Sequence, residues 1–77
     1  MKYFNKISVT TVSCEGNNDK ALTPPNNNGN YIPIMARPLS TWNTVGVIVF
    51  MADNSTYYIH AKGSDTQSYE IVWLVSQ

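Results

Sequence analysis

The sequence predicts an all-β fold: a small antiparallel five-stranded sheet or a partly closed barrel, in a single domain of residues 1–77. Valine, isoleucine and threonine together number 20, against three leucines and four alanines. Branched side chains fit a pleated sheet better than a helix. Apolar and polar residues also alternate at the period of a strand, and clusters of Asn, Gly and Pro separate these segments.

The first expected strand covers residues 7–14. Ile7 and Val9 are apolar residues at odd positions, whereas Val12 and Cys14 are apolar residues at even positions. The apolar side of the strand therefore changes along its length. One extra residue in a strand produces such a change of phase. We therefore expect a β-bulge near Thr10–Thr11.

Residues 15–30 predict a long loop between the first and second strands, because almost all of them are turn-forming residues. We expect this loop to be ordered, with residues 26–30 in contact with protein beyond their own turn. Pro24 and Pro25 reduce the entropy that is lost when such a loop becomes ordered. The second strand follows from Tyr31, and Pro33 lacks the N–H that a central strand needs. We expect an edge strand or a bulged strand here.

Three further strands are expected in the C-terminal half, where short turns predict an antiparallel meander. Their sequences are TVGVIVFMA, STYYIHA and QSYEIVWLVS. The first and third are apolar at both odd and even positions, so neither can leave a face in water cheaply. We expect the second face to be covered by barrel closure, by the long loop or by another subunit.

The chain has few means of stabilising itself. A domain of 77 residues buries only roughly 60–65% of the surface that its unfolded chain exposes. Cys14 is the single cysteine, so no disulfide can form within the chain. His60 is the single histidine, which also argues against a stabilising metal site. We therefore expect stabilisation by a protein partner or by a homo-oligomer.

The charge pattern argues against several partners. Five basic and five acidic residues give a formal net charge of zero, and they are scattered singly. Such a chain has no field that concentrates nucleic acid or an anionic membrane, and we expect neither as a partner. Lys6 and Ser8 interrupt the N-terminal apolar segment, so we expect no signal peptide. The expected location is the cytoplasm or a particle assembled there, such as a virion.

Candidate catalytic residues are sparse. Cys14, Glu15 and His60 are the trio that could provide a nucleophile, a base and an orienting group. A lone cysteine at a strand end is more often a small apolar residue, and we interpret it so. The acidic residues are isolated in turns and the glycines are far apart, which argues against a metal, a phosphate cradle or another cofactor. We expect no enzymatic activity.

Aromatic residues and one arginine are the candidates for contact with a partner or a ligand. Trp42 lies in a polar loop, and Arg37 lies beside a proline in the same segment. Tryptophan and arginine are enriched at interface hot spots. For Trp73, its shared parity with Ile71 favours burial in a core or interface over stacking on a ligand. The full set of interface or ligand candidates is Trp42, Arg37, Tyr31, Tyr57, Tyr58 and Trp73.

Three functions remain open on the sequence. The first is a non-enzymatic structural or assembly protein, a small β subunit that decorates or cements a larger particle or forms a homo-oligomer. A short Asn- and Thr-rich β chain without catalytic motifs is similar in this respect to accessory virion proteins. The alternatives are a glycan-binding module that uses exposed aromatic rings, or a small inhibitor that acts by protein–protein contact.

Overall fold

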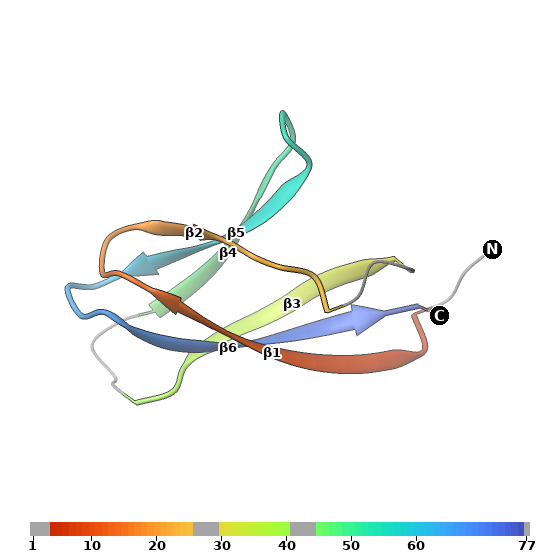
Figure 1. Ribbon diagram of the computed structural model, residues 1–77, viewed down its shortest axis with the longest axis horizontal. Helices are drawn as coiled ribbons and strands as arrows, with labels where there is room; N and C mark the ends of the chain where they lie inside the picture. Colours follow the sequence, from red (N-terminus) through yellow and green to blue (C-terminus); the bar gives the residue numbers. More distant parts are fainter. Residues whose placement is uncertain (1–3, 26–29, 41–44, 77) are drawn as a thin grey trace.

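The computed structural model describes residues 4–25, 30–40 and 45–76. These residues form two antiparallel sheets of three strands, with the strand orders β1-β6-β3 and β2-β5-β4. We call them the β6 sheet and the β5 sheet after their central strands. Figure 1 shows the two sheets facing each other, with the end of the β4–β5 hairpin projecting from the body. The strands are β1 (Lys6–Cys14), β2 (Asp19–Ala21), β3 (Tyr31–Pro38), β4 (Val45–Met51), β5 (Thr56–Lys62) and β6 (Gln67–Val75).

The core lies between the two sheets and is built mainly from alternate residues of β6. Every second side chain of this strand points inward, because successive side chains of a strand point to opposite faces. Four of them, Tyr69, Ile71, Trp73 and Val75, are at most 1% exposed. The other buried apolar residues are Ile59 and Ala61 of β5, Cys14 of β1 and Leu22.

The expected single sheet or barrel, with its C-terminal meander, is wrong. β4 and β5 do form the predicted hairpin, but β6 leaves that sheet and pairs with β1 and β3 in the other. Residues 63–66 make this crossing, and Gly63 adopts a positive φ of 126° that favours glycine. The turn at residues 63–66 is compatible with a return into the β5 sheet as well as with a crossing to the β6 sheet. The crossing allows β6 to bury one face and to pair on both edges.

The long loop is interrupted by a strand. β2 pairs with the free edge of β5, and two further backbone hydrogen bonds flank this pairing. They run from the Ala61 N–H to the Asn18 carbonyl at 2.9 Å and from the Leu22 N–H to the Tyr57 carbonyl at 2.8 Å. Backbone groups of β5 hold this segment in a strand although its residues are typical of turns. The composition of the segment therefore did not indicate the strand.

The rest of the loop is only partly described. Residues 26–29, where most of the predicted loop contact falls, lie outside the described residues. At Asn30 the carbonyl accepts a hydrogen bond of 2.9 Å from the N–H of Ser76, a contact beyond the local turn.

The expected bulge in β1 is also wrong, because β1 pairs with β6 in continuous register over nine residue pairs. The inward positions are Ser8, Thr10, Val12 and Cys14, so hydroxyl groups enter the space between the sheets. The reason is a polar contact in the interior. The indole N–H of Trp73 donates to the Thr10 hydroxyl at 2.8 Å, and a buried indole needs such a partner.

The edge position of β3 is confirmed. β3 pairs with β6 on one side only, and its register shifts between Pro33 and Met35. Pro33 is buried and the following Ile34 is 50% exposed. The bulge thus lets the strand pass a residue that cannot donate a backbone hydrogen bond.

We predict that Thr10→Val destabilises the protein by about 1–2 kcal/mol, since the change keeps the shape but leaves the buried Trp73 N–H without its acceptor. Urea unfolding followed by tryptophan fluorescence measures the free energy of unfolding. Thr11→Val is the matched control, because Thr11 faces outward and is exposed. Equal free energies of unfolding for the two variants would contradict this role of the hydroxyl.

Candidate functional site

The outer face of the β6 sheet carries an ordered array of outward apolar side chains that strand pairing creates. Two rows cross all three strands: Leu74 of β6 lies between its partners on β1 and β3, and Val72 does the same one row further on. Ile7 and Val9 on β1 are 64% and 54% exposed. We call this surface the apolar face; it consists of Ile7, Val9, Ile32, Met35, Val72 and Leu74.

A polar row borders the apolar face. Thr11, Glu70 and Arg37 are register partners in the next row of the same sheet. The Nε of Arg37 lies 3.0 Å from Oε1 of Glu70, and the arginine side chain is 54% exposed. An exposed pair of this kind adds little stability. An apolar centre with a polar border is, however, the usual composition of a protein interface. Arg37, predicted as an interface candidate, therefore lies at the rim of this face.

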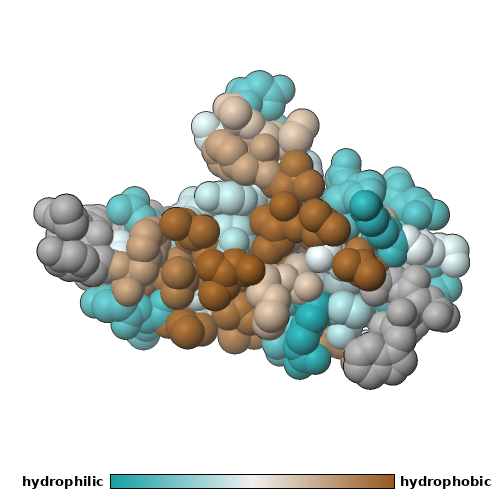
Figure 2. Space-filling view, turned by 180° about the vertical axis from the view of Figure 1, so that it is seen from behind, coloured by the Kyte–Doolittle hydropathy of each residue, from teal (hydrophilic) through white to brown (hydrophobic). Residues whose placement is uncertain are grey.

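A second apolar surface lies where the edge strands of the two sheets approach each other. Figure 2 shows this side of the molecule, with apolar side chains in a band that runs up to the base of the projecting hairpin. Between β3 and β4 lies an open groove of about 470 Å³. We call it the edge groove; it is lined by Pro33, Ile34, Met35, Ala36, Gly46, Val47 and Ile48.

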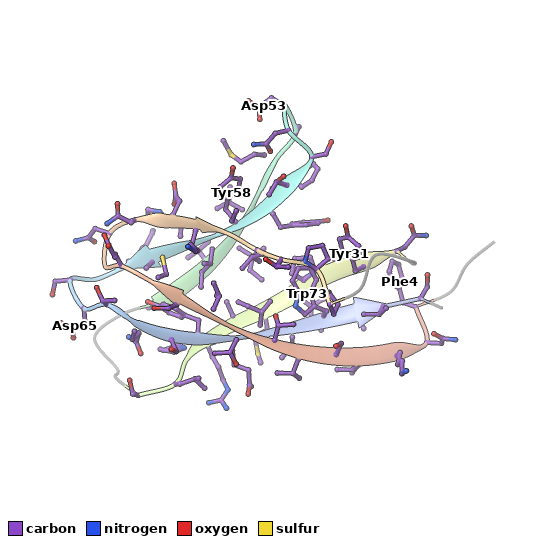
Figure 3. All side chains as sticks on the ribbon, in the orientation of Figure 1. Phe4, Tyr31, Asp53, Tyr58, Asp65 and Trp73 are labelled. Carbon is purple, nitrogen blue, oxygen red and sulfur yellow. The ribbon has the colours of Figure 1, made fainter. Side chains whose placement is uncertain are left out.

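Three of the predicted aromatic candidates come together in or beside the core. Tyr31 and Trp73 lie edge to face with ring centroids 5.7 Å apart, and Figure 3 shows both rings between the sheets. Tyr57 packs against the core and against Phe50 of β4, with ring centroids 4.8 Å apart. At 1% exposure Trp73 has no free face for a ligand. These rings therefore stabilise the fold.

The other candidates are placed differently. Trp42 lies outside the described residues. Tyr58 is on the outer face of the β5 sheet, and its hydroxyl accepts a hydrogen bond of 3.1 Å from the Asn54 side-chain amide. Beside it is a hollow of about 360 Å³, lined by Asp19, Val49, Met51, Tyr58 and His60. Among the six candidates, the structure thus assigns Tyr58 and Arg37 to the surface.

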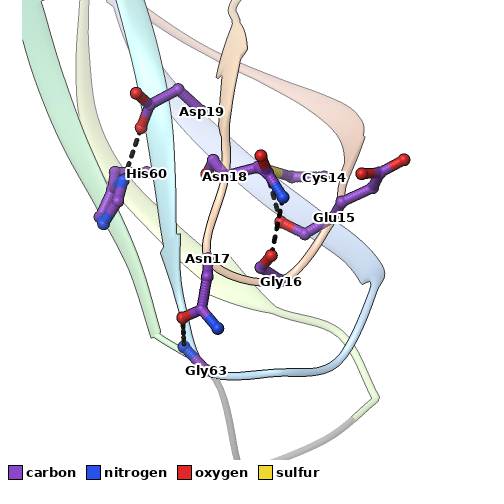
Figure 4. Close-up of polar contacts among 8 residues, drawn as sticks. All are labelled: Cys14, Glu15, Gly16, Asn17, Asn18, Asp19, His60 and Gly63. Atoms are coloured by element: carbon purple, nitrogen blue, oxygen red, sulfur yellow. Dashed lines mark hydrogen bonds and ion pairs between the residues drawn. The ribbon is translucent and has the colours of Figure 1, made fainter.

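The trio of Cys14, Glu15 and His60 does not assemble. Cys14 points inward and is 3% exposed, whereas His60 lies on the outer face of the β5 sheet. The Nδ1 of His60 lies 2.5 Å from the carboxylate of Asp19, which is 41 residues away in sequence (Figure 4). No local pattern in the sequence indicates this contact, because only the pairing of β2 with β5 brings the two residues together.

The Cys14 thiol is held by backbone groups of the β1–β2 turn. Its Sγ lies 3.4 Å from the carbonyl oxygens of both Glu15 and Asn18. Burial is the main cause that raises the pKa of the thiol above its usual value. A backbone hydrogen bond at Ala61 acts in the opposite direction, and the carboxylates of Asp19 and Glu15 raise the pKa further. A raised pKa leaves little thiolate at neutral pH, so Cys14 has the properties of a structural cysteine.

The β1–β2 and β5–β6 turns dock closely at this end of the molecule. The N–H of Gly63 donates to the side-chain oxygen of Asn17 at 3.1 Å (Figure 4). A Cβ on Gly16 would lie 2.4 Å from the backbone of Ser64, so only glycine fits there. Asn17 itself adopts a positive φ of 58°, which asparagine tolerates better than most residues.

The described residues contain no group of three or more His, Cys, Asp or Glu side chains arranged to hold a metal ion. None of their segments is a helix long and apolar enough to span a membrane.

Comparison of the chain with protein-family models, with curated proteins and with solved structures finds no match. The function must therefore be inferred from the surfaces of the molecule itself.

Sequence reasoning missed the residues of the apolar face as a candidate site. One signal for it was present: β6 is apolar at even as well as odd positions, which indicated that its second face is not left to water. The partners that complete the face, such as Ile7 and Met35, could not be identified. Their grouping depends on the registers of β1 and β3 with β6.

We predict that Cys14 of the folded protein reacts with Ellman's reagent at least about 100-fold more slowly than Cys14 of the urea-unfolded chain, because the thiol is buried and its pKa is raised. The absorbance of the released thiolate gives both rates at pH 8. A folded-state rate close to that of a free thiol would show that Cys14 is accessible.

Proposed function

We propose that this chain is a non-enzymatic assembly protein, a small β subunit that decorates or cements a larger protein particle or forms a homo-oligomer. The observation that carries the proposal is the apolar face of the β6 sheet. Its two rows run across all three strands, and its members on β1 and β3 are 38–64% exposed. Large contiguous apolar patches on small proteins commonly mark interaction sites.

The composition of this face favours a protein surface as the partner. Its side chains are branched or flexible aliphatic groups, with no aromatic platform for a sugar. The cation at its border, Arg37, is paired with Glu70. The Thr11–Glu70–Arg37 row gives it a polar border that can fix orientation. A flat aliphatic centre with one charged rim fits a second apolar protein surface.

The free energy gained by burying the apolar face limits how tightly this face can bind a partner by itself. Covering ~400 Å² of apolar surface on each of two partners contributes about 20 kcal/mol of gross stabilisation. Association costs roughly 4–15 kcal/mol in lost motion, besides the ordering of side chains. The apolar face is thus sufficient for moderate binding, and a durable assembly gains from a second contact.

Reactive groups support the non-enzymatic part of the proposal. Cys14 is buried and His60 is paired with Asp19 on the opposite side of the β5 sheet. A cysteine nucleophile needs a base within hydrogen-bond reach, which His60 does not provide. Among the described residues, the exposed imidazole of His60 is paired with the Asp19 carboxylate and has no cysteine, serine or threonine nucleophile beside it in the hollow that it lines.

One observation favours glycan binding as a second candidate function. The hollow beside Tyr58 combines an aromatic ring with the polar groups of Asp19 and His60, the combination that sugars use for stacking and hydrogen bonding. If this function is correct, Tyr58→Ala removes saccharide binding that the parent protein shows on a glycan array. Binding that is absent from the parent, or is unchanged in the variant, would contradict it.

The test of the assembly proposal is Val9→Lys, which puts a charge into the apolar face on β1, at a side chain that is 54% exposed and outside the core. We predict that the mass-average size of the protein, measured by light scattering after size-exclusion chromatography over a dilution series, falls below that of the parent. Ser13→Lys is the control, because it adds the same charge to an exposed position further along β1. Equal sizes of the parent and Val9→Lys would remove the support for this face.

A further inference from the structure

The described residues form four sheet edges, and β4 differs from the other three edge strands. Folded proteins commonly protect an edge with a charge, a proline, a bulge or a very short strand. β1 begins with Lys6, and β2 has three residues of which two are charged. β3 contains an arginine, two prolines and a bulge. β4, with the sequence VGVIVFM, is seven residues long and contains neither a charge nor a proline.

β4 is also exposed on both of its faces. Val45, Val47 and Val49 on its outer face are 57%, 38% and 38% exposed. Phe50, on the inner face, is 49% exposed although its ring touches Tyr57. The end of the hairpin projects beyond the body of the molecule, so the other sheet does not cover it (Figure 1). A long, neutral and apolar edge of this kind is a template for another strand.

We propose that β4 pairs antiparallel with β4 of a second copy of this chain, so that the two β5 sheets join into one continuous six-stranded sheet. The twofold axis passes through Ile48, which faces its own counterpart. The β4 edge belongs to the other sheet and differs from the apolar face of the β6 sheet, although Met35 lines both that face and the edge groove. The dimer makes the homo-oligomer of the proposed function specific and does not depend on the apolar face.

The sequence of β4 is complementary to itself in this register. On the outer face Val45 meets the second copy's Met51, and Val47 meets its Val49, so every contact joins two aliphatic side chains. On the inner face Gly46 meets the second copy's Phe50. A glycine opposite a phenyl ring is a favourable pairing in sheets, because the ring covers the backbone that glycine exposes. No like charges oppose each other, since β4 carries none.

The edge groove supplies space for the inner-facing side chains of the added strand. A strand placed beside β4 directs these side chains toward the gap between β4 and β3. That gap holds the open volume of about 470 Å³, lined by residues that include Ala36, Gly46 and Ile48. At Gly46 the sheets are in tight contact, because a Cβ there would lie 2.8 Å from Cδ1 of Ile59 and 3.2 Å from the Cβ of Ala36. The phenyl ring of the second copy's Phe50 therefore lies against the backbone of Gly46 at the mouth of the groove, and Gly46 must remain a glycine.

A second copy fits this edge better than an unrelated strand. Antiparallel self-pairing satisfies the outward backbone groups of both strands at once and uses one surface patch twice, as in the common twofold dimers. It also supports each projecting hairpin end, because Phe50 and Met51 of one copy lie beside Gly46 and Val45 of the other. A charged partner strand would gain no electrostatic attraction from β4.

The first experiment measures mass. The parent protein should elute as a species of twice the 8.6 kDa chain mass or a multiple of it, by light scattering after size-exclusion chromatography over a dilution series. Val47→Lys should raise the dissociation constant of the β4-mediated dimer at least about tenfold, since a lysine at the centre of an edge disfavours pairing. Ser13→Lys, on β1, should leave the constant unchanged. Circular dichroism and urea unfolding establish that each variant is folded.

The possible outcomes separate this dimer from the assembly through the apolar face. A parent protein that is monomeric throughout the dilution series overturns the β4 pairing. A dimer that survives Val47→Lys and is lost in Val9→Lys also overturns it, while supporting the apolar face. A dimer that is lost in Val47→Lys and survives in Val9→Lys supports the β4 pairing, whatever the apolar face does.

The second experiment tests the register. In a Cys14→Ala background, Val47→Cys and Val49→Cys variants are mixed and oxidised. The proposed register places these two positions directly opposite each other across the dimer, with Cα atoms about 4.5–5.5 Å apart, within the reach of a disulfide. The mixture should form a cross-linked heterodimer in severalfold higher yield than either variant alone. Equal yields from the mixture and from Val47→Cys alone would overturn the register centred on Ile48.

Discussion

The alternation of side chains along β6 is the constraint on which the rest of the structure depends. Tyr69, Ile71, Trp73 and Val75 fill the space between the sheets, and no other strand contributes as many buried side chains. β6 must therefore be central in its sheet, paired on both edges, with its second face turned outward. The same alternation that builds the core creates the apolar face, because Val72 and Leu74 have nowhere else to point.

The thinness of the molecule explains why its apolar surface is not hidden. Two three-stranded sheets enclose a single layer of side chains, and the principal extents of 42 × 27 × 14 Å leave only two outer faces and four edges. Each strand that buries one face presents the other to the outside. A small chain can make its outward positions polar, as β1 does in part, but β4 and β6 are apolar on both sides. Apolar side chains therefore remain on the outside of the fold, and this exposed surface is the basis of both proposals.

The two surfaces proposed for interaction depend on different physical contributions. The apolar face is flat and contributes through the area removed from water, so its partner needs only a matching apolar patch. The β4 edge offers backbone hydrogen-bonding groups in a fixed order, and its partner must be an extended strand in register. If both proposals are correct, one small subunit extends a sheet in one direction and stacks against another surface in a second direction, which is the geometry of the proposed assembly protein.

The sequence by itself determined the strand content, the β4–β5 hairpin, the edge position of β3 and the inward parity of β6, because branched residues, turn residues and proline act locally on the backbone. It also indicated that some apolar surface needs a cover. Tertiary structure alone decided that β6 crosses to the other sheet, that β2 forms on the edge of β5, and that Thr10 faces the indole of Trp73. These features arise from pairing between distant segments. The apolar face, the edge groove and the Asp19–His60 pair exist only after that pairing sets the register, which no local pattern records.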